Sequence, residues 1–192
     1  INISIDLLHN FEEHPFQIRM DEDMLKLVDS VKENGVLSPI LVRSRKNGEG
    51  YEIVAGHRRK TACSLNAIQE VPTVIRELSD EQATILMVDS NIQRENILPS
   101  ERGFAYKMKL DAMKKQGKRT DLTLAQVGPK LKKGGSIEVL AEEVGDTRNQ
   151  IKRFIRITYL IPELIEYVDG TRKDRKKIAF NPAVELSFLN DE

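Results

Sequence analysis

Residues Gly56 to Ala62 read Gly-His-Arg-Arg-Lys-Thr-Ala and have the composition of a phosphate-binding turn. They follow a strand-like run at 51–55 and precede a helix-like run at 61–67. A glycine at such a turn lets the backbone approach a ligand closely, and a helix start offers N–H groups and a positive dipole end. The guanidinium forks of Arg58 and Arg59 match phosphate oxygens. A solvated basic turn has the same composition, so the motif needs support from elsewhere in the chain.

Residues 136–156 have the pattern of a helix-turn-helix. We expect Ser136 to cap a short first helix, Gly145 to form the turn, and Asp146 or Thr147 to cap the second helix. The inward positions would be Val139, Leu140 and Val144 in the first helix, and Ile151, Phe154 and Ile155 in the second. A hairpin of two helices with a wet outer face is the alternative interpretation of this pattern.

The second helix of this pair would expose side chains that suit the major groove of DNA. Arginine reads guanine, and asparagine or glutamine reads adenine, through paired hydrogen bonds. Residues near the helix start would contact bases, whereas Lys152 and Arg156 would hold phosphates. The predicted DNA-binding residues are Thr147, Arg148, Asn149, Gln150, Lys152, Arg153 and Arg156.

The elements around the basic turn predict a small mixed unit of strands and helices. A short edge strand at 3–7 is followed by a loop at 14–19 and by a helix that Asp21 caps and Gly35 ends. Further strands are expected at 39–43, 51–55 and 71–76, the first two joined by a hairpin turn at 46–50.

Beyond residue 78 the pattern becomes helical. Helices are expected at 80–93 and 99–115, and the polar, glycine-containing stretch 117–135 is interpreted as a loop or insertion. We therefore predict an α+β unit at 1–78, connecting helices that complete the nucleotide site at 79–116, the insertion at 117–135, and an all-α helix-turn-helix unit at 136–192.

The composition is that of an ordinary globular protein, with 40% hydrophobic and 31% charged residues. The single cysteine, Cys63, excludes a disulfide framework and is expected to be a small buried residue in a reducing compartment. No apolar run approaches the roughly 18 residues that span a bilayer, so no membrane partner is expected. Because the sequence opens on Ile1, it is interpreted as an excised piece of a longer chain.

The net charge of zero hides an asymmetry between the two halves. Residues 1–96 carry 11 Lys and Arg against 16 Asp and Glu, and residues 97–192 carry 19 against 14. Between Arg102 and Arg156 the counts are 14 and 6. This excess of positive charge indicates a second half that faces nucleic acid, although lysine-rich exposed helices would also produce it.

The two motifs, in this order, resemble the ParB family of plasmid and chromosome partition proteins. The resemblance covers about residues 3–161, weakens inside 117–135, and rests on four segments before the helix-turn-helix. Residues 14–19 (HPFQIR) resemble the family's N-P-x-Q-P-R segment, and 35–43 resemble the strand after its first helix. Residues 56–62 resemble its G-E-R-R-x-R-A box, and 90–95 (SNIQRE) its E-N-I-Q-R box.

The resemblance implies a nucleotide-binding domain that takes CTP with Mg²⁺, and a dimer that closes into a sliding DNA clamp. The implied nucleotide-binding residues are Gln17, Arg19, Gly56, His57, Arg58, Arg59, Thr61, Asn91, Arg94 and Glu95, with Asn91 helping to hold Mg²⁺. It also implies a palindromic, centromere-like double-stranded DNA site, a homodimer, a ParA-like ATPase partner, and a cytoplasmic protein associated with the nucleoid or a plasmid.

The sequence departs from the family motifs at several positions. His57 replaces the glutamate of the arginine box, Thr61 replaces its second-last arginine, and Ser90 replaces the glutamate before Asn91. A serine cannot supply carboxylate charge to a hard cation, so the departure predicts nucleotide binding with weak or absent CTP hydrolysis. His14 for asparagine and Ile18 for proline are milder changes in the pocket loop.

Two other functional classes stay open at the sequence level. The first class is an enzyme with the ParB fold, since free-serine kinases and sulfiredoxins share this fold. The cysteine that a sulfiredoxin requires is absent at position 57 of this sequence. A nuclease would need a cluster of carboxylates to hold its metal ions. The other is a plasmid-encoded transcriptional regulator. His9 and His14 lack partners at metal-ligand spacing and are interpreted as loop or surface histidines.

Overall fold

The computed structural model describes residues 1–192 apart from 47, 95, 124–134, 175 and 190–192, and only the backbone of 118–123. The chain forms two compact units, Ile1–Ser90 and Asn91–Glu192. Most of α3 (Asp80–Ile92) thus groups with the first unit, whereas the sequence placed a division at residue 78. Each unit is described by itself below.

The first unit is built on a mixed five-stranded sheet in the order β1-β5-β3-β4-β2. Its strands are β1 (Asn2–Ser4), β2 (Leu8–His9), β3 (Ile40–Ser44), β4 (Tyr51–Ala55) and β5 (Glu70–Ile75). The β1–β5 and β3–β4 pairs are antiparallel, and the β3–β5 and β2–β4 pairs are parallel. The basic turn begins at the end of β4, which lies between β3 and the edge strand β2.

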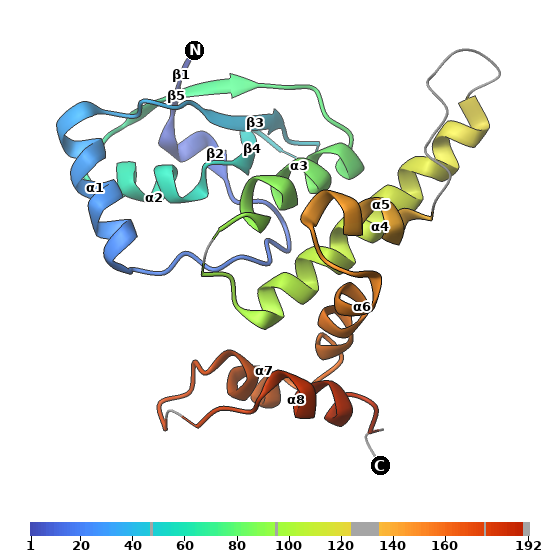
Figure 1. Cartoon of the computed structure of the whole chain (residues 1–192). Helices are drawn as coiled ribbons and strands as arrows, with labels where there is room; N and C mark the ends of the chain where they lie inside the picture. The colour runs from blue at the N-terminus through green and yellow to red at the C-terminus, as the bar shows by residue number, and fades with distance from the viewer. Residues whose placement is uncertain (47, 95, 124–134, 175, 190–192) are drawn as a thin grey trace. The chain divides into compact units, whose positions relative to one another are not determined.

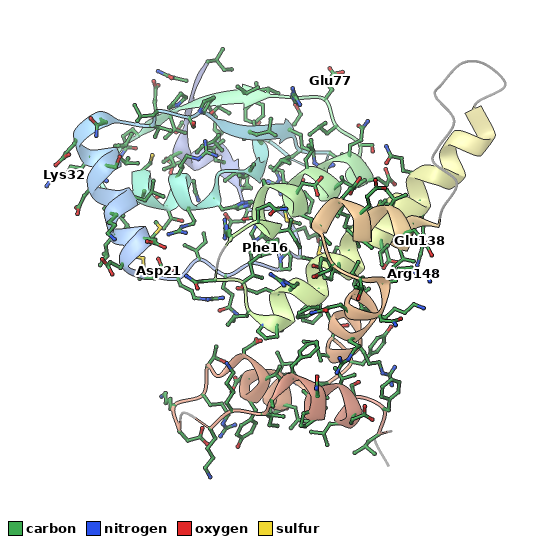
Figure 2. The ribbon with its side chains drawn as sticks, in the orientation of Figure 1. Phe16, Asp21, Lys32, Glu77, Glu138 and Arg148 are labelled. Carbon is green, nitrogen blue, oxygen red and sulfur yellow. The ribbon has the colours of Figure 1, made fainter. Side chains whose placement is uncertain are left out.

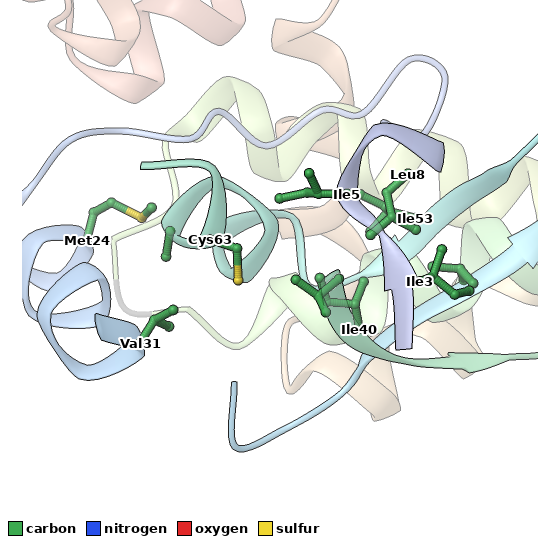
Figure 3. Packing of buried hydrophobic residues seen from close by; sticks show 11 residues of the cluster. Ile3, Ile5, Leu8, Met24, Val31, Ile40, Ile53 and Cys63 are labelled. Carbon is green, nitrogen blue, oxygen red and sulfur yellow. The ribbon is translucent and has the colours of Figure 1, made fainter. Parts of the chain in front are cut away.

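Two helices of the first unit, α1 (Glu22–Asn34) and α2 (His57–Leu65), lie side by side, and α2 packs against β3 (Figure 1). Asp21 caps α1 as predicted, because its Oδ1 accepts the Met24 N–H at 2.8 Å. Gly35 ends the helix with a φ of 68°. Figure 3 shows the core that results; its buried residues are Ile3, Ile5, Leu8, Met24, Val31, Ile40, Val42, Ile53, Ala62, Cys63 and Val71.

Two predicted boundaries in the first unit are wrong. The expected strand at 3–7 ends at Ser4 and continues as a short 3-10 helix, η1 (Ile5–Leu7), because Ile5 and Leu8 both turn into the core. The helix expected from Thr61 begins at His57, four residues earlier. Gly56 supplies the sharp turn by itself, so the two arginines lie in the first turn of α2 and not in a loop before it.

The second unit contains only helices among the residues that the structure describes. After α3 these are α4 (Pro99–Thr123), α5 (Ser136–Val144), α6 (Arg148–Ile157), α7 (Pro162–Asp169) and α8 (Phe180–Leu186). Helix α4 packs against α5, α6 and α7, and α8 packs against α6 and α7. In the described part of the chain, no helix has a stretch long and apolar enough to cross a bilayer.

Two predictions in the second unit also need correction. Helix α4 runs to Thr123, past Gly117, where the sequence predicted a loop; one glycine inside a long helix costs only about 1 kcal/mol and does not stop it. The cap of α5 is Gly135, and Ser136 is the first helical residue. The rest of the predicted insertion, 124–134, lies outside the described residues.

Candidate functional site

The first candidate site is the start of α2, where Gly56 turns the chain from β4 into the helix. Gly56 has a φ of 114°, which L side chains rarely adopt, and a Cβ there would lie 3.3 Å from the Ile40 side chain. The turn therefore needs glycine for conformation and for space. The first N–H groups of a helix have no acceptor inside the helix and carry its positive dipole end. The turn can thus present N–H groups to an anion.

Arg58 is oriented by the cap of the neighbouring helix. Its Nη2 lies 3.3 Å from Asp21 Oδ1, the same oxygen that accepts the Met24 N–H. Asp21 (Figure 2) therefore caps α1 and holds Arg58 with one carboxylate oxygen. The Arg58 side chain is 27% exposed, so its guanidinium lies within reach of solvent and of a ligand.

Arg59 has a different set of contacts from its neighbour. Its Nη1 donates to the carbonyl oxygens of Ser38 and Pro39, at 2.5 and 2.6 Å. Burial lowers the pKa of the Arg59 guanidinium, and the Cys63 sulfur opposes this change. An arginine stays charged at neutral pH. Arg59 consequently ties the segment before β3 to α2, and its predicted role as a phosphate ligand stays a prediction.

His57 and Thr61 direct their polar atoms into the protein. His57 is only 3% exposed, and its Nε2 accepts the Phe11 N–H at 3.4 Å. The Thr61 hydroxyl donates to the His57 carbonyl within the same helix, at 3.1 Å. Both residues are therefore engaged in structural hydrogen bonds, and the structure does not test their predicted nucleotide contacts.

The other predicted nucleotide residues lie on two separate segments. Gln17 is exposed and Arg19 is half-buried, both in the loop between β2 and α1 that the buried Phe16 anchors. In the second unit, Asn91 is buried near the end of α3, and its carbonyl accepts the Arg94 N–H at 3.1 Å. Glu95 lies outside the described residues.

A preformed metal centre is not visible in the described part of the chain. No group of three or more His, Cys, Asp or Glu there is arranged to hold a metal ion. Ser90, at the position where the sequence departs from the family motif, donates its hydroxyl to the Met87 carbonyl at 2.9 Å.

The second candidate site is the predicted helix-turn-helix, formed by α5 and α6. Gly145 ends α5 with a φ of 74°, and Thr147 caps α6 by accepting the Gln150 N–H on its Oγ1 at 3.2 Å. Of the two predicted caps, Thr147 is thus the one used. Helix α6 buries Ile151, Phe154 and Ile157; the predicted Ile155 is only partly buried.

The side chains predicted to bind DNA are exposed at the start of α6. Exposed residues are Thr147, Arg148, Asn149, Gln150, Lys152 and Arg153, and Arg156 is half-buried. Arg148 forms a 2.6 Å ion pair with Glu138 of α5 (Figure 2). The hydrogen bond from Arg148 lowers the pKa of the Glu138 carboxyl. This exposed pair spans the two helices and pre-orients Arg148, and water screens it strongly.

The last two arginines of α6 contact α8, which the sequence did not predict. Arg153 Nη2 donates to Asn181 Oδ1 at 2.5 Å, and its guanidinium lies over the Phe180 ring. Arg156 Nη2 donates to the Ser187 carbonyl at 2.6 Å and lies 4.1 Å from the Phe188 ring centroid. Arg156 therefore anchors α8, and its expected phosphate contact stays a prediction.

Helix α4 holds the helix-turn-helix in place, and this feature too was missed from the sequence. The Tyr106 hydroxyl donates to Asp146 in the turn, and Lys109 pairs with Glu143 of α5 at 2.6 Å. Gly103 lets α4 approach α6 closely, since a Cβ there would clash with the Phe154 carbonyl oxygen. Tyr106 and Lys109 have the residue types of an ordinary half-exposed helix, so the sequence alone does not indicate these contacts.

Comparison with known proteins identifies the family of the N-terminal domain. Residues 1–92 match the family model of the ParB N-terminal domain. The chromosome-partitioning protein Spo0J of Thermus thermophilus is 33% identical over 172 residues, which cover 90% of this chain and 54% of that protein. Residues 1–92 thus belong to the ParB N-terminal domain family. Stage 0 sporulation protein J of Bacillus subtilis is 35% identical over 163 residues, covering 82% of this chain and 50% of that protein. The chain spans about half the length of these curated relatives.

Solved structures show the same fold. A C-terminally truncated chromosome-partitioning protein ParB from Caulobacter crescentus, complexed to the centromeric parS site, aligns with a TM-score of 0.57 and 23% identity, covering 100% of this chain and 86% of that chain. A Pnob8-like ParB-N domain aligns with a TM-score of 0.59 and 17% identity, covering 97% and 78%. The predicted α+β, ParB-like fold is confirmed.

We predict that Tyr106→Phe destabilises the protein and alters its alkaline stability. Burial, and then the hydrogen bond to Asp146, raise the pKa of the Tyr106 phenol. Its stabilising contribution is therefore complete below the ordinary tyrosine pKa of about 10 and is lost as the pH rises above that value. At pH 7.5 the variant should lose about 1–3 kcal/mol of unfolding free energy. Denaturant unfolding followed by circular dichroism at several pH values measures both effects.

The control for this experiment is Tyr159→Phe, because the Tyr159 side chain is 59% exposed. It should leave the stability at pH 7.5 unchanged. Equal alkaline loss of stability in wild type and Tyr106→Phe would contradict the assignment to Tyr106.

Proposed function

We propose that this chain is a DNA-binding partition protein of a plasmid, chromosome or mobile element. The observation that carries the proposal is the α5–α6 helix-turn-helix, whose second helix begins with the exposed Arg148, Asn149 and Gln150. These three residue types read base edges in the major groove. The names of the curated relatives, chromosome-partitioning protein Spo0J among them, support the role in partition.

We further propose that the first unit binds a nucleoside triphosphate, CTP, which switches the DNA-binding state. The start of α2 supports this, because Gly56 exposes helical N–H groups and Arg58 is held beside them by Asp21. Gln17 and Arg19 are proposed to contact the nucleotide from the loop between β2 and α1. Bound nucleotide would supply phosphate oxygens to Mg²⁺, and the Asn91 amide oxygen is the ligand type that this ion takes.

The proposed DNA site and assembly follow from the helix-turn-helix. A dimer reads two half-sites separated by one helical turn or a multiple of it, so the proposed DNA site is palindromic and the proposed assembly is a homodimer. A ParA-like ATPase is the proposed protein partner. The place of action is the DNA of the nucleoid or a plasmid in the cytoplasm.

The DNA-reading role of α6 is tested by Arg148→Ala. Duplexes are first selected by the wild-type chain from a randomised library, and affinity is measured by fluorescence anisotropy against a scrambled duplex. The variant should lose about 1–3 kcal/mol for the selected duplex and little for the scrambled one. Arg148→Lys keeps the charge and loses the fork, so it should weaken selected binding while leaving the salt dependence unchanged.

The matched control is Lys32→Ala, which removes one positive charge from the exposed end of α1. It should bind both duplexes as the wild type does. Equal losses on the selected and scrambled duplexes in Arg148→Ala would assign this residue to phosphate contacts and contradict base reading.

The nucleotide site is tested by Arg58→Ala in the full chain. Removing this guanidinium takes away a charged donor at the start of α2, so CTP affinity should fall by about 2 kcal/mol or more. Isothermal calorimetry with each nucleoside triphosphate, with and without Mg²⁺, measures the loss and the nucleotide preference. Lys32→Ala is again the charge control, and DNA binding by the nucleotide-free variant should be unchanged. If the wild-type chain bound no nucleoside triphosphate, the proposed nucleotide switch would be refuted and only the proposed DNA binding would stand.

Hydrolysis of CTP is expected to be weak or absent, because Ser90 brings no carboxylate to the site and donates its hydroxyl to Met87. Phosphate release with CTP, Mg²⁺ and selected DNA measures it. Ser90→Glu places a carboxylate before Asn91 and should raise the rate above that of the wild type. Robust turnover by the wild type would refute the expectation.

A further inference from the structure

Two histidines from different segments of the first unit are in direct contact. The rings of His14 and His57 have centroids 4.0 Å apart and planes inclined by 50°. His14 lies in the loop between β2 and α1, and His57 is the first residue of α2. With His57 only 3% exposed, this is a contact of the protein interior and not of a solvated surface.

The hydrogen bonds of the two rings fix the loop at two places. His14 Nδ1 lies 2.8 Å from the Phe16 carbonyl oxygen; a carbonyl can only accept, so this nitrogen carries a proton and donates. His57 Nε2 accepts the Phe11 N–H at 3.4 Å, so the His57 ring is neutral with its proton on Nδ1. The loop is thereby held at Phe11 by His57 and at Phe16 by His14. Both phenylalanines are themselves buried.

Positions 14 and 57 are also two of the places where the sequence departs from the ParB motifs. His14 stands in the pocket-loop segment and His57 in the arginine box. The two departures are far apart in the sequence and meet in one ring contact.

We propose that His14 and His57 form a positioning pair that sets the loop carrying Gln17 and Arg19 against the first turn of α2. His57 is then a positioning residue for nucleotide binding and not a ligand, and His14 is its partner. The inference rests on the proposed nucleotide-binding function and adds the residues that organise its site. Anchoring a loop before the ligand arrives removes part of the entropy cost of binding, so the pair acts by pre-organisation.

The test is a double-mutant cycle in the full chain with His14→Ala, His57→Ala and the double variant. CTP affinity in the presence of Mg²⁺ is measured by calorimetry. Each single variant should bind CTP about tenfold more weakly, and the double variant should lose less than the sum of the two single losses, because both changes break the shared ring contact. His57→Phe keeps a ring against His14 but loses the acceptor of the Phe11 N–H, so it should recover only part of the affinity that His57→Ala loses. His9→Ala, which removes the chain's third histidine from β2, is the control and should bind as the wild type does.

The proposed pair would be overturned if the losses of CTP affinity in the two single variants were strictly additive. It would also be overturned if His57→Phe bound CTP as weakly as His57→Ala does. A second readout does not depend on the nucleotide: hydrogen exchange of the backbone amides of residues 11–19 in the nucleotide-free protein. Exchange there should accelerate in both single variants and in the double variant, and not in His9→Ala. If the wild type binds no CTP, the proposed function fails while this measurement still decides on the pair, since unchanged exchange in the variants would overturn it.

Discussion

The first unit depends on one backbone constraint, the positive φ of Gly56 between β4 and α2. Because the turn takes a single residue, the next three side chains leave the start of α2 in different directions. His57 reaches the loop between β2 and α1, Arg58 reaches the cap of α1, and Arg59 reaches the carbonyls before β3. Three segments distant in the sequence are thus tied to one helical turn. A side chain at position 56 would strain the backbone and press on Ile40, and all three connections would shift with it.

In the helical unit, contacts from α4 and from the residues around the end of α8 fix the position of α6. Tyr106 of α4 fixes the turn before the helix through Asp146, and Gly103 allows α4 to lie close to its back. At the other end, Arg156 is bound by the Ser187 carbonyl and by the Phe188 ring. The helix is therefore held at its start and at its end, while the side chains of its first turn are exposed and can contact a ligand. Placing readers on a rigid element is what precise recognition of base edges requires.

Local sequence signals predicted most of the helix ends, although Gly135 and not Ser136 caps α5. The Asp21 cap, the Gly35 and Gly145 helix ends and the Thr147 cap depend on residues within a few positions of each other. The start of α2 was misplaced because the basic run Arg58-Arg59-Lys60 resembles a loop, and only the sheet reveals that Gly56 alone makes the turn. The contacts of Arg59, Tyr106 and Arg156 join segments far apart in the chain, and the hydrophobic periodicity of the sequence does not indicate which distant residues meet.

Residues of one type take different roles here according to their partners, and a charge count cannot separate them. Arg58 and Arg59 are adjacent, yet Arg58 pairs with a half-exposed carboxylate while Arg59 donates to two main-chain carbonyls. A carboxylate can exchange its arginine for water or a counter-ion, since an exposed pair is worth little. Arg59 donates to two successive carbonyls from one nitrogen, so moving it would break two hydrogen bonds at once. A phosphate arriving at α2 would therefore recruit Arg58 at low cost and leave Arg59 in place. The same reasoning separates Arg148, paired with the exposed Glu138, from Arg156, bound to α8. In both units, the arginine nearer the helix start is the one whose present partner is easiest to replace.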